Sequence, residues 1–183
     1  MARDQIDMTP IETRDELVAW LEAGCKPKAQ FRVGTEHEKF AFTAADHRPV
    51  PYSDKRSIHA LLAGMHGLLG WEPIMEGDNI IGMFDVTGGG AISLEPGGQF
   101  ELSGAPLDNV HQTAAELMAH LAQVREVAKP LGIGFLGLGM TPNWTRADMP
   151  KMPKGRYKIM TAYMPKVGSL GLDMMYRTCT VQA

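Results

Sequence analysis

Residues 91–103, AISLEPGGQFELS, decide the fold, because they read as two short strands joined by a tight turn. Before the turn the apolar residues Ile92 and Leu94 alternate with polar neighbours, and the residues after the turn repeat this alternation. A period of two is the pattern of a half-buried strand. The Pro-Gly-Gly step at 96–98 is a turn signal. The stretch therefore predicts a hairpin with one apolar face and one polar face.

Strand-like and helix-like segments continue on both sides of this hairpin. Hairpin-type connections favour a mainly antiparallel sheet, so the predicted fold class is α+β with the helices packed on the outer face of the sheet. The last run, TCTVQA, stops without a turn signal, which predicts a fold that is incomplete at the C-terminus. Further strands are predicted at 31–42, 71–76, 79–85, 132–139 and 172–182, and helices after Thr13, after Ser57, at 108–130 and near 155–163.

Composition narrows the classes of protein to consider. The formal net charge is −3 and no run of Lys or Arg occurs, so no basic field for nucleic acid is present. No stretch of about 18 apolar residues occurs, which argues against a membrane span. Residues 1–17 lack the apolar core of a signal peptide and carry too many acids for a transit peptide. We therefore expect a cytoplasmic protein with no nucleic-acid or membrane partner, and with Cys25 and Cys179 as free thiols.

Four glutamates on predicted strands are the first candidates for chemistry. Glu36 and Glu38 lie two residues apart on one strand, so their side chains share a face, roughly 6.5–7 Å apart. Glu95 and Glu101 flank the hairpin turn on its polar face, where folding can bring both to one cavity. Solvated strand faces are the alternative for both pairs, and His37 points to the opposite face. Four strand glutamates with almost no Asp or His nearby nevertheless suggest a hard oxygen site, which suits Mg²⁺ or Mn²⁺.

A second group of candidates is basic. Residues 151–158, KMPKGRYK, form a loop that leads into a short predicted helix. The guanidinium of Arg156 in this loop can donate two parallel hydrogen bonds to a carboxylate or a phosphate. A solvated basic loop is the alternative. Arg177 lies between Met175 and Cys179 on the last predicted strand, and an arginine on an apolar face needs a partner. Either a structural salt bridge or a substrate anion would supply one.

Six strings in the chain resemble a known family, the plant and proteobacterial type of glutamate–cysteine ligase, from about residue 12 to the end. The resemblance implies the glutamine synthetase-like catalytic fold, an antiparallel sheet curved into a funnel with glutamates that hold divalent metals. It also implies ATP-dependent joining of the γ-carboxylate of L-glutamate to the amine of L-cysteine through a γ-glutamyl phosphate, the first step of glutathione biosynthesis. The strings are FRVGTEHEKFAF, IMEGDNIIG, ISLEPGGQFELSGAPLDNVHQT, GIGFLGLG, MPKGRYKIM and YMPKVGSLGLDMMYRTCTVQ.

The same resemblance implies roles for single residues. Glu36, Glu38, Glu95 and Glu101 are implied to hold Mg²⁺ or Mn²⁺ around the phosphates of ATP, and to act in catalysis together with Arg156. The residues implied to line the amino-acid pockets are Arg156, Tyr157, Met175, Arg177 and Thr178.

Members of this family are more than twice as long as the present chain. Residues 1–183 are therefore predicted to be the N-terminal part of a single catalytic domain, and to be inactive alone. Two alternatives stay open, namely a related carboxylate–amine ligase with a different amine substrate, and a short non-catalytic binding or regulatory module. The sequence makes no prediction of the oligomeric state.

Overall fold

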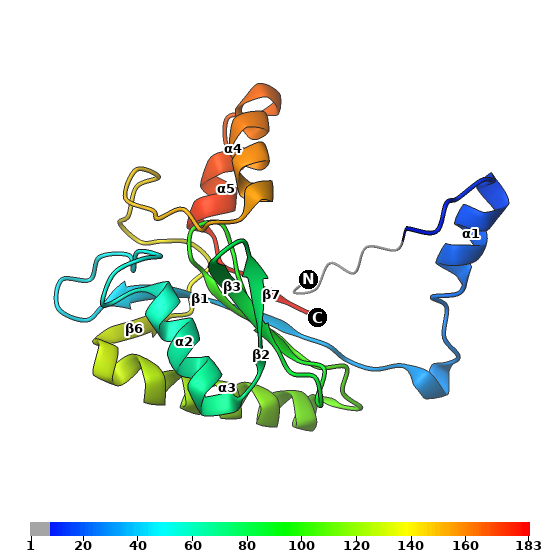
Figure 1. Ribbon diagram of the computed structural model, residues 1–183, viewed down its shortest axis with the longest axis horizontal. Coiled ribbons are helices and arrows are strands. Elements are labelled where there is room, and N and C mark those ends of the chain that lie inside the picture. The colour runs from blue at the N-terminus through cyan, green and yellow to red at the C-terminus, as the bar shows by residue number, and fades with distance from the viewer. Residues whose placement is uncertain (1–7) are drawn as a thin grey trace.

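A computed structural model describes residues 8–183 as one curved sheet with helices against one face and at one end (Figure 1). The strand order is β2-β3-β4-β5-β1-β6, and β7 pairs with β1 beside β6. All these pairings are antiparallel, which confirms the predicted mixture of helices with a mainly antiparallel sheet. The strands are β1 (Glu36–Thr43), β2 (Glu72–Glu76), β3 (Asn79–Phe84), β4 (Ala91–Leu94), β5 (Phe100–Ser103), β6 (Ile133–Leu136) and β7 (Val181–Gln182).

The predicted hairpin of β4 and β5 is present in the middle of the sheet. The backbone N–H of Glu95 donates to the carbonyl of Gln99 at 3.0 Å, and the N–H of Gly98 donates to the carbonyl of Glu95 at 2.9 Å. Gly98 has a φ of 81°, which glycine adopts without the steric cost that a side chain would add. The turn therefore fixes which side chains of β4 and β5 share a face.

Helices cover the apolar face of this sheet. α2 (Ile58–Leu69) and α3 (Val110–Leu131) lie against it (Figure 1), while α4 (Gly155–Val167) and α5 (Gly171–Arg177) lie together at one end of the strands. We call the covered side the helix face. Its core includes Leu61, Leu62 and Met65 of α2, Val124 and Ala128 of α3, and Ile92, Leu94 and Phe100 of the hairpin.

The first helix, α1 (Arg14–Glu22), begins after Thr13 as predicted, with a capping box at its start, and is followed by the 3₁₀ turn η1 (Lys28–Gln30). The Thr13 hydroxyl accepts the N–H of Glu16, and the Glu16 carboxylate accepts the N–H of Thr13. α1 stands apart from the sheet and has no buried residue; Trp20 is 70% exposed. None of the helices within residues 8–183 is both long and apolar enough to cross a membrane.

The predicted strand at 172–182 is wrong over most of its length. Residues Gly171–Arg177 form the helix α5, and only Val181–Gln182 form a strand, β7. Asp173 and Arg177 lie one helical turn apart and form an ion pair at 2.9 Å, which favours the helix. Met175 and Tyr176 are buried in the core from the same helix. Arg177 therefore lies in the last turn of a helix, and its partner is a structural carboxylate.

Candidate functional site

The polar face of the central strands, which we call the acid face, carries the four predicted glutamates. Glu38 of β1 lies directly opposite Glu101 of β5, and Glu101 lies opposite Ser93 of β4. Side chains directly opposite each other in an antiparallel pair have Cβ atoms about 4.5–5.5 Å apart. Glu95 continues the acid face two residues beyond Ser93, and Glu36 continues it two residues before Glu38.

Two of these carboxylates are fixed by hydroxyl and backbone donors. Glu101 is only 3% exposed, and the hydroxyl of Ser103 donates to its Oε1. Glu38 accepts the backbone N–H and the hydroxyl of Thr180, both at 3.0 Å, one on each carboxylate oxygen. Thr180 reaches Glu38 because β7 pairs with the start of β1. The sequence gives no local signal for this contact, which joins residues 142 positions apart.

The carboxylates of the acid face also repel one another. The pKa of Glu95 is raised to about 7, mainly by burial and also by the neighbouring carboxylates of Glu101 and Glu38, against the opposing effect of the Lys154 and Arg156 cations. Burial likewise raises the pKa of Glu38, against the bonds from Thr180, with contributions from Glu101 and Glu36. The charged forms of Glu38 and Glu95 are therefore disfavoured where they lie.

A cationic rim lies at the end of the acid face near Glu95, where α4 begins. The hydroxyl of Tyr157 donates to the carbonyl of Leu94 at 2.7 Å and lies 3.5 Å from Glu95 Oε1. The Lys154 ammonium donates to the same Leu94 carbonyl at 2.8 Å, and Arg156 lies 5.2 Å from the Tyr157 ring. Burial, followed by the Glu95 carboxylate, raises the pKa of Tyr157, so its hydroxyl stays protonated. The structure thus places Arg156 and Tyr157 next to Glu95.

Lys154 is a residue of this rim that sequence reasoning missed. Its side chain is buried, and burial lowers the pKa of the ammonium, with Arg156 acting in the same direction. Its position three residues before Tyr157, across the first turn of α4, is the signal that could have found it.

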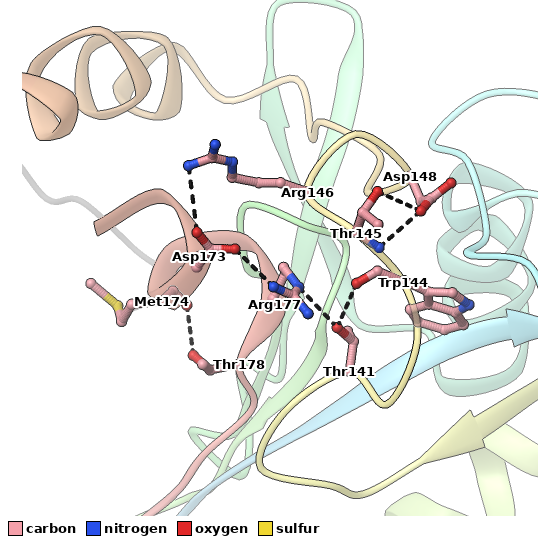
Figure 2. Close-up of polar contacts among 9 residues, drawn as sticks. All are labelled: Thr141, Trp144, Thr145, Arg146, Asp148, Asp173, Met174, Arg177 and Thr178. Carbon is pink, nitrogen blue, oxygen red and sulfur yellow. Dashed lines mark hydrogen bonds and ion pairs between the residues drawn. The ribbon is translucent and has the colours of Figure 1, made fainter. Parts of the chain in front are cut away.

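The other predicted pocket residues belong to α5 and its end, where a separate polar network lies (Figure 2). Arg177 bonds Asp173 at 2.9 Å and the Thr141 hydroxyl at 3.3 Å, and the Thr178 hydroxyl donates to the carbonyl of Met174. Met175 is buried in the core. These contacts stabilise α5 and leave Met175, Arg177 and Thr178 with structural partners instead of the glutamates.

Gln99 connects α5 to the hairpin. Its amide nitrogen donates to the carbonyl of Thr178 at 2.7 Å, with longer contacts to the carbonyls of Met175 and Tyr176. Its amide oxygen accepts the N–H of Gly97 at 2.8 Å. This fully buried side chain therefore sets the position of α5 relative to the turn of the acid face.

The donor chemistry of the acid face fits a hard divalent cation. Its carboxylates come from three adjacent strands and are oxygen donors of the kind that Mg²⁺ and Mn²⁺ prefer. In the part of the chain from residue 8 onward, no three acidic, His or Cys side chains are already close enough to share an ion. Glu38, Glu95 and Glu101 now point to Thr180, Tyr157 and Ser103, so sharing an ion requires rotation of their side chains.

Cavities do not by themselves mark this site. A cavity of about 700 Å³ lies along α1 and is lined by residues between Thr9 and Leu21. A cavity of about 360 Å³ opens at the outer end of the acid face, between Glu36, Ser103 and Gln182. The cavity along α1 is lined by none of the acid-face glutamates, so its volume does not mark their site.

Comparison with known proteins gives one consistent family. The sequence model described as "Glutamate-cysteine ligase family 2 (GCS2)" matches residues 32–183. A chloroplastic glutamate–cysteine ligase from Medicago truncatula is 56% identical over 179 residues, which cover 98% of this chain and 34% of that protein. Its Arabidopsis thaliana counterpart is 59% identical over 170 residues, 93% of this chain and 32% of that protein. The chain thus spans about a third of the length of the curated relatives it matches.

These names contradict the cytoplasmic location expected from the sequence. The relatives from Medicago truncatula, Arabidopsis thaliana and Oryza sativa are all named as chloroplastic, which overturns that expectation. The expectation was wrong because it rested on the composition of residues 1–17, and composition alone does not determine cellular location.

Proposed function

Because the chain belongs to Glutamate-cysteine ligase family 2, we propose that the protein is an ATP-dependent ligase that joins the γ-carboxylate of L-glutamate to the amine of L-cysteine. This would be the first step of glutathione biosynthesis. The described residues would form part of a single catalytic domain with a glutamine synthetase-like sheet. The printed names of the relatives, together with identities of 55–59%, support this assignment.

One observation carries the proposal: Glu38, Glu95 and Glu101 come from three adjacent strands and share one face. The pKa values of Glu38 and Glu95 are raised there. Together with Glu36 they would hold Mg²⁺ or Mn²⁺. When bound, such an ion would neutralise charge between these carboxylates and the phosphates of ATP. Grouping like charges costs free energy unless a cation joins them, so the arrangement is expected where a cationic ligand binds.

The remaining residues would position the reactants. Arg156 is exposed at the rim and can bind an anionic group of the substrate, while Tyr157 and Lys154 hold the Leu94 carbonyl and so fix the end of β4 next to Glu95. Met175, Arg177 and Thr178 would act from α5, which Gln99 ties to the same hairpin. A γ-carboxylate is a poor electrophile, and its phosphorylation would supply a leaving group for attack by the amine.

The test is ATP-dependent phosphate release by the product of the complete gene, with glutamate and a panel of amines that includes cysteine. We expect Glu101→Gln and Glu36→Gln to lower turnover, Glu101→Gln by about 100-fold or more, because a group that organises charge for the transition state is lost. Glu126→Gln on the exposed side of α3 is the matched control and should leave turnover unchanged. Near-normal turnover of Glu101→Gln would refute the metal assignment, and a preference for another amine would refute the substrate assignment.

A further inference from the structure

Ser93 is a buried side chain on the acid face that takes no part in the contacts of the glutamates or of the cationic rim. It is only 3% exposed, and its strand neighbours Ile92 and Leu94 are fully buried in the core on the helix face. Side chains alternate along a strand, so the Ser93 hydroxyl points to the acid face, where Glu101 lies directly opposite. Among residues 8–183 the hydroxyl oxygen has no hydrogen-bond partner.

The neighbouring side chains show that this is an exception. Ser103, on the same face of the adjoining strand, donates its hydroxyl to Glu101, and the buried amide of Gln99 uses both its nitrogen and its oxygen. On the other side, Gly82 of β3 lies opposite Ser93 and contributes no side chain. Nothing from either neighbouring strand therefore satisfies the hydroxyl of Ser93.

A merely structural role does not explain a serine at this position. A buried hydroxyl without a partner loses its bonds to water and gains nothing in return. Ala91, two residues earlier on the same face of β4, is 4% exposed, so a methyl group is accommodated there without that cost. An unpartnered hydroxyl next to a buried carboxylate is expected where a ligand supplies the missing bond.

We propose that Ser93 is a positioning residue for the divalent cation of the acid face, and that its hydroxyl bonds a water molecule of that cation while Glu101 contacts the cation. This inference rests on the proposed function. Mg²⁺ gives up its waters reluctantly and keeps several of them in protein sites, so the outer oxygen groups of a site bind those waters. Ser93 and Glu101 lie directly opposite each other on adjacent strands, so both side chains face the same part of the acid face.

The experiment uses the product of the complete gene and Mn²⁺ alone as the probe, with free Mn²⁺ measured by its electron paramagnetic resonance signal. We expect Ser93→Ala to weaken Mn²⁺ binding by about 10-fold, the lower end of the effect of outer-sphere partners. Thermal unfolding of the metal-free protein should show an unchanged or higher midpoint for Ser93→Ala, because the substitution removes an unsatisfied hydroxyl. Ser103→Ala, which removes a hydroxyl that has a partner, should lower that midpoint.

The outcomes separate this inference from the function beneath it. If the wild type binds Mn²⁺ no better than Glu101→Gln does, the metal assignment fails and the role of Ser93 fails with it. If the wild type binds Mn²⁺ and Ser93→Ala binds it equally well, only the role of Ser93 is overturned. A lower midpoint for metal-free Ser93→Ala would show a structural hydroxyl and would also overturn it.

Discussion

The two faces of the central strands both bury ionisable side chains, but they treat the charge differently. On the acid face, Glu38 and Glu101 keep hydroxyl and backbone donors, and Lys154 and Arg156 stand at the rim. On the helix face, His120 of α3 is 2% exposed, and neither of its ring nitrogens has a partner within the described residues. Burial, followed by the cations of Lys39 and His37, lowers the pKa of His120 to about 3, so its imidazole stays neutral. The acid face thus groups carboxylates beside polar donors, while the imidazole of His120 on the helix face is buried in its neutral form.

The largest expected effect comes from two adjacent residues, Phe100 and Glu101, which are both nearly fully buried but point to opposite faces. Phe100 contacts Phe135, with ring centroids 5.7 Å apart, and stacks on His120 at 6.3 Å. Truncation of a buried phenylalanine leaves a cavity, so Phe100→Ala should lower the free energy of unfolding by about 3–5 kcal/mol. Urea unfolding of the complete gene product measures this loss.

Glu101→Gln is the matched variant for Phe100→Ala. It keeps the size of the side chain and relieves repulsion with Glu38 and Glu95, so its free energy of unfolding should change by less than about 1 kcal/mol while turnover is lost. The distinction between the faces fails if Glu101→Gln unfolds the protein as readily as Phe100→Ala does.

The next effect is a dependence of stability on pH that originates on the helix face. The pKa of His120 is about 3 in the folded protein and 6.5 in the unfolded chain, because burial and the cations of Lys39 and His37 disfavour its protonation. Between these two values the unfolded chain binds more protons, so stability falls as the pH drops below 6.5. Glu116, one turn away on α3, faces the same region of β1 and favours protonation of His37.

His120→Leu should remove this contribution. Between pH 7 and pH 5 the wild type is expected to lose roughly 2 kcal/mol more of unfolding free energy than the variant does, at about 1.4 kcal/mol per pH unit below pH 6.5. Urea unfolding at the two pH values measures the difference, and His111→Leu, at an exposed position of the same helix, serves as the control. Equal losses in the wild type and in His120→Leu would mean that the imidazole is solvated or paired.

Sequence reasoning found the acid face but not the contacts that complete it. The alternation in 91–103 and the Pro-Gly-Gly turn are local, so the hairpin and the shared face of Glu95 and Glu101 could be predicted. The pairing of Thr180 with Glu38 depends on the register of strands 142 residues apart, which no local pattern encodes. The run 172–177, LDMMYR, is too short for its periodicity to separate a helix from a strand. Its helix is held by Gln99, which bonds the Thr178 carbonyl from 79 residues away.

The smallest effect is expected from the ion pair of Asp173 and Arg177, which supplies a baseline for the buried charges of both faces. Their side chains are 27% and 22% exposed, and solvent screens a pair of this kind, so a double-mutant cycle with Asp173→Asn and Arg177→Gln should give a coupling of about 0.5 kcal/mol. Arg146 lies 3.4 Å from the other oxygen of Asp173 and remains its partner when Arg177 is replaced, which reduces the coupling further (Figure 2). A coupling above about 2 kcal/mol would show that the guanidinium is desolvated like the groups of the acid face. Such a value would support the proposed role of Arg177 toward the substrate, because a desolvated guanidinium binds an anion more strongly than a screened one does.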